Sequence, residues 1–243
     1  LAIPEAKTNK PTAFWGSKKV SLSVLKRCAG REHPLQLIDR RIRAMGRLTN
    51  KNILFVIPKD YYDEKELDQL LPIFKNEDAT IMIASGKLKE AVGLKTGRVA
   101  PDILIVDAME GITGDSYVTG GTGTRQIKGI FHGVVVIGGR GARSYLWKDR
   151  LLKLLLTDRH RSGFVVSAIG WGVPCLGIAG LLENVEVAAE EDKKILSELE
   201  KAKALPCGEE VTVYNRVIAA KNASAAQEFA EVVIQEVGKT PSK

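Results

Sequence analysis

Short apolar runs that stop at glycine or proline recur along the chain and constrain its fold more than any other feature. The clearest runs span 52–58, 79–85, 133–137 and 164–169. Continuous apolarity is typical of strands buried on both faces of a parallel sheet. Stretches with helical spacing of apolar residues separate these runs, which predicts right-handed crossover helices. We therefore expect an α/β fold, a three-layer sandwich with a mostly parallel, flavodoxin-like sheet and helices on both faces.

Further elements complete this pattern. A short strand is expected over 101–107, and a hairpin over 211–214 and 217–220 around Asn215-Arg216. One expected helix begins at Asp63, and four others cover 144–157, 173–182, 190–203 and 223–237. Ligand sites of such sheets lie at the carboxyl ends of the strands. The turns after Pro58, Ile137 and Ile169 are therefore the candidate site.

Charge divides the chain into two predicted parts. Residues 1–51 hold 12 Lys or Arg and three acidic residues, a net charge of +9. The rest holds 24 basic and 26 acidic residues, a net charge of −2. We expect a basic N-terminal extension over 1–51 and an α/β domain over 52–243. Within the extension, apolar spacing over 35–48 predicts one amphipathic helix with a basic outer face.

A basic extension indicates an anionic partner, such as an acidic protein surface or nucleic acid. A solvated tail and the remnant of an organelle-targeting segment are the alternatives. We expect a protein partner or a larger assembly to bind residues 1–51, and a homo-oligomer is compatible with the sequence. Membrane-surface binding is disfavoured because the apolar face of the predicted helix lacks Trp and Phe.

Several functional classes are disfavoured by what the sequence contains. No apolar run approaches the roughly 20 residues that span a bilayer, and no signal peptide is expected. Three widely spaced cysteines argue against a disulfide framework and suit a reducing compartment, the cytoplasm or an organelle interior. The basic N-terminal segment is compatible with the matrix of an organelle as that compartment. The three histidines show no metal-ligand spacing, so neither a metal nor a cofactor is expected.

The turn after Ile169 is the most informative motif. A buried strand runs into a helix through Gly170, Trp171 and Gly172. A nucleophile elbow has this strand-turn-helix form, because it lifts one residue to a helix N-terminus where free backbone amides stabilise negative charge. A plain tight turn is the alternative, and the spacing alone favours it.

The segment 167–182 resembles the elbow of the ThiJ/PfpI family, and its sequence is SAIGWGVPCLGIAGLL. Four other segments resemble family marks in the same order: 84–85, 101–102, 134–139 and 222–229. The resemblance covers about residues 52–238. It leaves out 1–51 and much of 111–129, which is expected to be an insertion or a lengthened loop. It implies an α/β fold related to glutamine amidotransferases.

The resemblance also implies a site. Family enzymes attack with an elbow cysteine, and this chain has Gly170 there, followed by Trp171. Glycine supplies no thiolate, so covalent catalysis by the family route is not available. The amides of Gly138, Gly139 and Trp171 correspond to oxyanion or anion donors.

A carboxylate after the first strand tunes the thiol in the family enzymes. Glu66 matches that carboxylate, with Asp68 as the alternative, and both could equally be exposed helix charges. Cys175 and Ser167 are not expected to replace the missing nucleophile. The glycine-rich stretches 120–125 and 138–143 lack the complete phosphate-loop and dinucleotide patterns. Arg140 and Arg143 are interpreted as surface arginines near the second stretch, with anion binding as the alternative.

Three functional hypotheses follow. The first is a non-catalytic ThiJ/PfpI-like protein that serves as an interaction or structural subunit of a larger assembly. The second is a cysteine-independent hydrolase or lyase, of peptidase, glyoxalase or deglycase type, with Glu66 as general base. The third is an active cysteine enzyme that carries an engineered change of cysteine to Gly170. The sequence leaves enzymatic activity open and favours its absence.

Overall fold

A seven-stranded sheet forms the centre of the computed structural model, which describes residues 46–111, 117–120, 123–126 and 129–241. The strand order is β12-β13-β9-β8-β1-β2-β5, and every neighbouring pair is parallel except β12 with β13. The strands are β1 (Asn52–Val56), β2 (Thr80–Ser85), β5 (Ile103–Leu104), β8 (Gly133–Val136), β9 (Val165–Ile169), β12 (Val211–Tyr214) and β13 (Val217–Ala220). The mostly parallel α/β sheet predicted from the apolar runs is confirmed.

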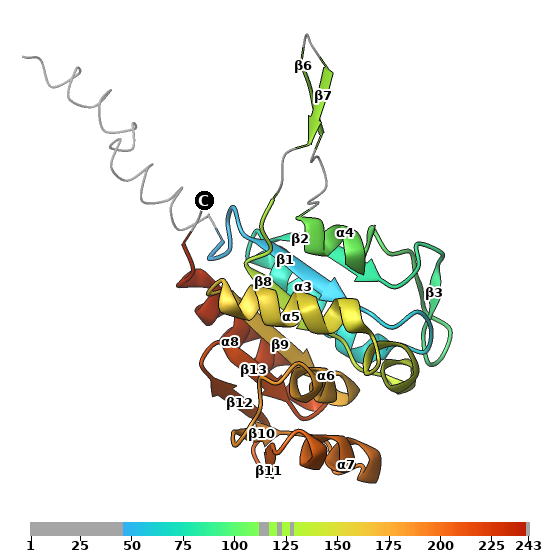
Figure 1. Cartoon of the computed structure of the whole chain (residues 1–243), viewed down its shortest axis with the longest axis vertical. Helices are drawn as coiled ribbons and strands as arrows, with labels where there is room; N and C mark the ends of the chain where they lie inside the picture. Colours follow the sequence, from blue (N-terminus) through green and yellow to red (C-terminus); the bar gives the residue numbers. More distant parts are fainter. Residues whose placement is uncertain (1–45, 112–116, 121–122, 127–128, 242–243) are drawn as a thin grey trace, which may run out of the picture. The chain divides into compact units, whose positions relative to one another are not determined.

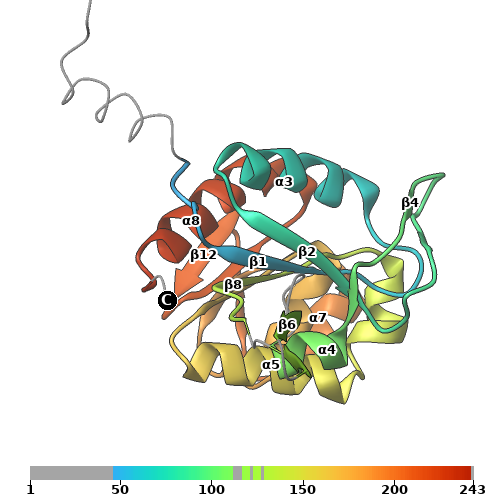
Figure 2. The ribbon, with the colours of Figure 1, turned by 90° about the horizontal axis from the view of Figure 1, so that it is seen from above.

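Helices cover both faces of this sheet (Figures 1 and 2). On one face, α3 (Glu64–Asn76) and α8 (Ala226–Gly238) share a core cluster that includes Phe74 and Phe229. Residues of α4 (Ile105–Glu110), α5 (Arg150–Arg161), α6 (Val173–Ile178) and α7 (Lys193–Lys201) belong to the cluster of the other face. The central strands β8 and β9 are buried at every residue, as strands covered on both faces must be.

Two predicted elements are wrong in extent. The strand expected over 101–107 contains only β5, because α4 begins at Ile105 and the Asp107 carboxylate accepts from the Leu104 amide at its start. The helix expected over 144–157 is two elements. A π-helical turn, η1 (Ala142–Leu146), comes first, and α5 begins after Asp149, whose carboxylate caps it.

Other boundaries shift by a few residues. The helix expected over 173–182 ends at Ile178, and the one expected over 190–203 begins at Lys193, after the cap residue Asp192. The last predicted helix starts as a 3-10 turn, η3 (Ala223–Ala225), and continues as α8. The Asn215-Arg216 hairpin turn is confirmed, with both residues at positive φ.

Three short two-stranded sheets were not predicted. They are β3 (Ala91–Val92) with β4 (Arg98–Val99), β6 (Tyr117–Gly120) with β7 (Gly123–Gln126), and β10 (Glu186–Ala188) with β11 (Leu205–Cys207). The antiparallel pair β6-β7 lies inside the segment 111–129, for which an insertion or a lengthened loop was expected. The glycine-rich stretch 120–125 therefore contains strand residues.

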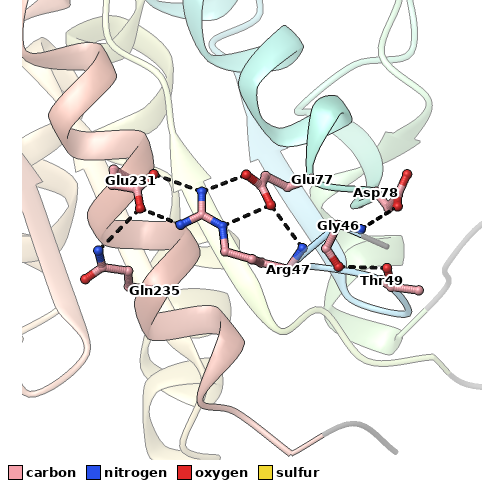
Figure 3. Close-up of polar contacts among 7 residues, drawn as sticks. All are labelled: Gly46, Arg47, Thr49, Glu77, Asp78, Glu231 and Gln235. Atoms are coloured by element: carbon pink, nitrogen blue, oxygen red, sulfur yellow. Dashed lines mark hydrogen bonds and ion pairs between the residues drawn. The ribbon is translucent and has the colours of Figure 1, made fainter. Parts of the chain in front are cut away.

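The chain divides into two units, residues 1–44 and 45–243, and all described residues belong to the second. Most of the helix predicted over 35–48 lies outside the described residues, while Arg47 and Leu48 are in a turn and not in a helix. Leu48 is fully buried in the core. The Arg47 guanidinium bonds both Glu77 at the end of α3 and Glu231 on α8 (Figure 3). Residues 46–51, the described end of the predicted basic extension, are thus packed into the domain.

Candidate functional site

Gly170 lies at the turn where the central strand β9 enters the 3-10 turn η2 (Gly170–Gly172) and then α6. Its backbone has φ of +56°, in the left-handed region that residues other than glycine rarely adopt. Strand, tight turn and helix follow one another directly, and Gly170 is buried at the carboxyl end of β9. This is the strained geometry of a nucleophile elbow.

Glu66 is a buried carboxyl group in the first turn of α3. Its side chain is directed into the protein with a residue exposure of 3%, and Oε2 accepts a hydrogen bond of 2.7 Å from the Gly138 amide. Asp63 caps the same helix, and its own amide donates to the Gly138 carbonyl at 3.1 Å. The start of α3 is therefore fixed to the turn after β8. Asp68, the alternative carboxylate, is exposed.

Glu66 also occupies the space in front of Gly170. A Cβ atom built on Gly170 would lie 2.3 Å from Glu66 Oε1, far inside normal contact distance. A Cβ on Gly138 would lie 2.9 Å from Glu66 Oε2 and 2.7 Å from the Trp171 amide nitrogen. The structure thus brings Glu66, Gly138, Gly170 and Trp171 together at one point on the carboxyl edge of the sheet.

Burial raises the pKa of Glu66 well above its ordinary value. The negative charge of Asp63 raises it further, the Gly138 hydrogen bond opposes the rise, and Glu190 adds a smaller increase. The Glu66 carboxyl group therefore keeps its proton at pH values where an exposed glutamate has lost it.

The double glycine after β8 is required by close backbone contacts. Gly139 has φ of +106°, and a Cβ there would lie 2.4 Å from the Tyr61 carbonyl oxygen and 2.5 Å from the Asp63 nitrogen. The Gly138 amide, one of the three expected oxyanion donors, already binds Glu66. This arrangement leaves the anion-binding role of Gly138, Gly139 and Trp171 a prediction.

The comparison with protein families decides the assignment. A family model described as the DJ-1/PfpI family matches residues 51–236. The chain belongs to the DJ-1/PfpI family. Among curated proteins, an uncharacterized protein of Methanocaldococcus jannaschii is 28% identical over 193 residues, covering 79% of this chain and 85% of that protein.

Solved structures of DJ-1/PfpI proteins share the fold. A ThiJ/PfpI domain protein of Brachyspira murdochii superposes with a TM-score of 0.66 at 23% identity, covering 80% of this chain and 99% of that one. DJ-1beta of Drosophila melanogaster gives a TM-score of 0.61 at 16% identity, covering 78% and 91%. The resemblance inferred from the ordered motifs is confirmed. That Gly170 stands at the cysteine position remains a prediction, and its φ angle supports it.

Two tryptophans pack against each other at the turn that begins with Gly170. The rings of Trp171 and Trp147 stack with centroids 6.0 Å apart and an angle of 16°. Trp147 Nε1 donates to the Trp171 carbonyl oxygen at 2.9 Å, so the residue after the elbow glycine is held by ring and backbone together. Glu190 lies nearby; burial raises its pKa, Asp192 raises it further, and a hydrogen bond with the Trp171 side chain opposes the rise. No spacing signal in the sequence pointed to Trp147 or Glu190.

Cys175 and Ser167, the residues considered in the sequence as replacements for an elbow nucleophile, are both buried in the core. Cys175 is buried in α6, and burial raises the pKa of its thiol, which makes it unreactive. The Ser167 hydroxyl is buried in β9 and donates to the Val134 carbonyl oxygen at 2.9 Å. Cys207 is on β11 and partly buried, and Cys28 lies outside the described residues.

Neither metal ligation nor a membrane span is found in the described part of the chain. Its His, Cys, Asp and Glu side chains form no group of three or more that could hold a metal ion. None of its helices is long and apolar enough to cross a bilayer.

Proposed function

We propose that this DJ-1/PfpI protein is non-catalytic and serves as an interaction or structural subunit of a larger assembly. One observation carries the proposal: the position that would present a nucleophile is Gly170, and the Glu66 carboxyl group fills the adjacent space. Family covalent chemistry needs a thiolate at the elbow, and a glycine provides none. The Glu66 carboxyl group is buried and accepts a hydrogen bond from the Gly138 amide, and burial raises its pKa, so we interpret it as a structural hydrogen-bonding group.

The distribution of basic residues supports the assembly role. Residues 1–51 hold 12 Lys or Arg, and two of them serve the domain itself. Arg47 binds Glu77 and Glu231, and Lys51 Nζ donates to the Thr240 carbonyl oxygen. The ten that remain precede Gly46 and are Lys7, Lys10, Lys18, Lys19, Lys26, Arg27, Arg31, Arg40, Arg41 and Arg43.

A segment with so many cations suits an acidic protein surface, with nucleic acid as the other partner to test. The widely spaced cysteines support a reducing compartment for this assembly, the cytoplasm or an organelle matrix.

The second candidate is a cysteine-independent hydrolase or lyase that uses the same pocket. The raised pKa of Glu66 favours it, since general bases and acids of enzymes are tuned in this direction. Its weakness is geometric, because Glu66 is almost fully buried and its Oε2 already binds the Gly138 amide.

Partner capture by the full-length chain tests the proposal. The triple variant R40E/R41E/R43E is compared with K65E/K75E/K153E, which reverses three exposed helix lysines. We expect the first variant to lose a stable partner that wild type and the control retain. Equal partner recovery by all three proteins would count against docking through the basic segment. If RNase treatment releases the partner from the wild-type protein, RNA mediates the contact.

The catalytic alternative needs its own assay. Wild type and Glu66→Gln are incubated with methylglyoxal and with a peptide panel. We expect neither to turn over any of them. Turnover by wild type that Glu66→Gln abolishes would establish the second candidate in place of the first.

A further inference from the structure

A cavity of about 500 Å³ opens beside the tryptophan pair, outside the elbow itself. It is lined by seven residues: Arg143, Ser144, Trp147, Lys148, Ile178, Glu198 and Lys201. Neither Gly170 nor Glu66 is among them. The volume is within the range of small-molecule sites, about 300–1,000 Å³.

The charge of this lining is strongly positive. The lining contains three cationic side chains, Arg143, Lys148 and Lys201, and one carboxylate, Glu198. Its net charge is therefore +2. Glu198 pairs with Lys201 at 2.7 Å. Arg143 and Lys148 form no ion pair with any residue that the structure describes. Among the described residues, two cations are therefore left without a paired carboxylate in a concave site, next to the Lys201–Glu198 pair.

The cations come from separate elements that meet only in the folded chain. Arg143 and Ser144 are on the π-helical turn η1, Lys148 follows it, and Lys201 is in the last turn of α7. Short π-helical turns occur frequently at functional sites. The turn follows β8, so the cavity lies toward the carboxyl edge of the sheet, where ligands of open α/β sheets bind.

The remaining lining residues favour a ligand that has an apolar organic part as well as an anionic group. Trp147 and Ile178 provide an apolar wall, and the Ser144 hydroxyl adds a donor and acceptor. Phosphate esters carry about −1.5 to −2 charges at neutral pH, which matches the net charge of the lining. Arginine and lysine are the usual phosphate-binding side chains.

We infer that this cavity binds a small organic phosphate, with Arg143, Lys148 and Lys201 around the phosphate group and Trp147 and Ile178 against the organic part. The inference rests on this lining alone and holds whether or not the protein is catalytic. A ligand in the cavity would contact Trp147, whose ring stacks on Trp171, the residue that follows Gly170.

Titration of the full-length protein with phenyl phosphate tests the inference, with phenol as the matched ligand that lacks the phosphate. Calorimetry and tryptophan fluorescence follow binding. We expect saturable binding of phenyl phosphate that weakens with added salt, and none of phenol. No saturable signal from phenyl phosphate up to about 10 mM at low salt would overturn the inference.

A charge-matched pair of variants tests the location. We expect R143Q/K148Q to weaken phenyl phosphate binding at least about tenfold, since each lost charge-assisted hydrogen bond contributes substantially. The control R140Q/K153Q removes the same charge from exposed residues outside the lining and is expected to keep wild-type affinity. Equal weakening by both double variants would show a diffuse charge effect and contradict the site.

Discussion

Glu66 Oε1 lies 2.3 Å from the point where a Cβ atom on Gly170 would stand. The carboxyl group and the glycine are therefore complementary, since the glutamate can approach the elbow so closely only because the elbow residue has no side chain. Glu66 and the glycine therefore fill this turn together, and the carboxyl group accepts a hydrogen bond from the Gly138 amide.

Gly170→Ala tests this complementarity. We expect it to destabilise the protein by about 1–2 kcal/mol from left-handed backbone strain, plus a further loss because Glu66 must move. Gly163→Ala is the matched control, because Gly163 has φ of +84° and a Cβ there meets nothing within 4 Å. Urea unfolding compares the two, and an equal loss in both variants would show that Glu66 does not crowd the elbow.

Glu66→Gln should change how stability depends on pH. The folded pKa of Glu66 is raised above the ordinary value of 4.5, so between those two values the folded chain keeps a proton that the unfolded chain has lost. Wild-type stability should then fall as pH rises above about 4.5, by about 1.4 kcal/mol for each pH unit crossed below the folded pKa. Gln keeps an acceptor for the Gly138 amide and should remove this fall.

Asp68→Asn is the control for that experiment, because Asp68 is exposed on the same helix. Urea unfolding from pH 5 to pH 8 measures all three proteins. Parallel stability curves of Glu66→Gln and wild type over this pH range would contradict the raised pKa of Glu66.

His132 should make the stability of the protein depend on pH in the opposite direction. Burial lowers its pKa below the ordinary 6.5, and the charge of Lys51 lowers it further. Below about pH 6.5 the unfolded chain takes up a proton that the folded chain resists, so stability should fall as pH decreases toward the folded pKa.

His132→Asn tests this, since its side-chain oxygen can still accept from Asn52. We expect a weaker acid-side loss of stability in the variant, with His160→Asn behaving as wild type. An unchanged acid-side slope in His132→Asn would assign the loss to other groups.

Arg47 should contribute through its planar guanidinium. Its three nitrogens bond Glu77 and Glu231, which joins α3 to α8 (Figure 3). We expect Arg47→Ala to cost about 1 kcal/mol, a modest figure because the pair is partly exposed, and Arg47→Lys to recover only part of it. Thermal unfolding at low and high salt measures the loss. Arg98→Ala, which removes a longer and more exposed contact with Glu90, should change little.

The fold was largely predictable because the continuous apolar runs of the central strands indicate strands that helices cover on both faces. The short run 101–107 was misassigned because four apolar residues, 103–106, fit a strand or a helix equally, and only the contact of Asp107 with the Leu104 amide separates them. Local polar contacts of this kind leave no periodic signal.

The site was predictable only in part. Gly170, Gly138 and Glu66 followed from ordered motifs, yet the sequence left Glu66 and Asp68 as alternatives. The structure separates them because Glu66 lies one turn before the buried Leu70, whereas Asp68 points to solvent. Trp147 and Glu190 reach the elbow from segments that pair with it only in the folded chain, so no sequence spacing could reveal them.

The native mass of the particle isolated from its source, with full-length protein, tests the central claim most directly. We predict a stable complex in which this 26.5 kDa chain is accompanied by different protein or nucleic-acid components, and no turnover of methylglyoxal or peptides by that complex. A mass equal to the monomer or to a simple multiple of it, together with turnover that Glu66→Gln abolishes, would contradict the account.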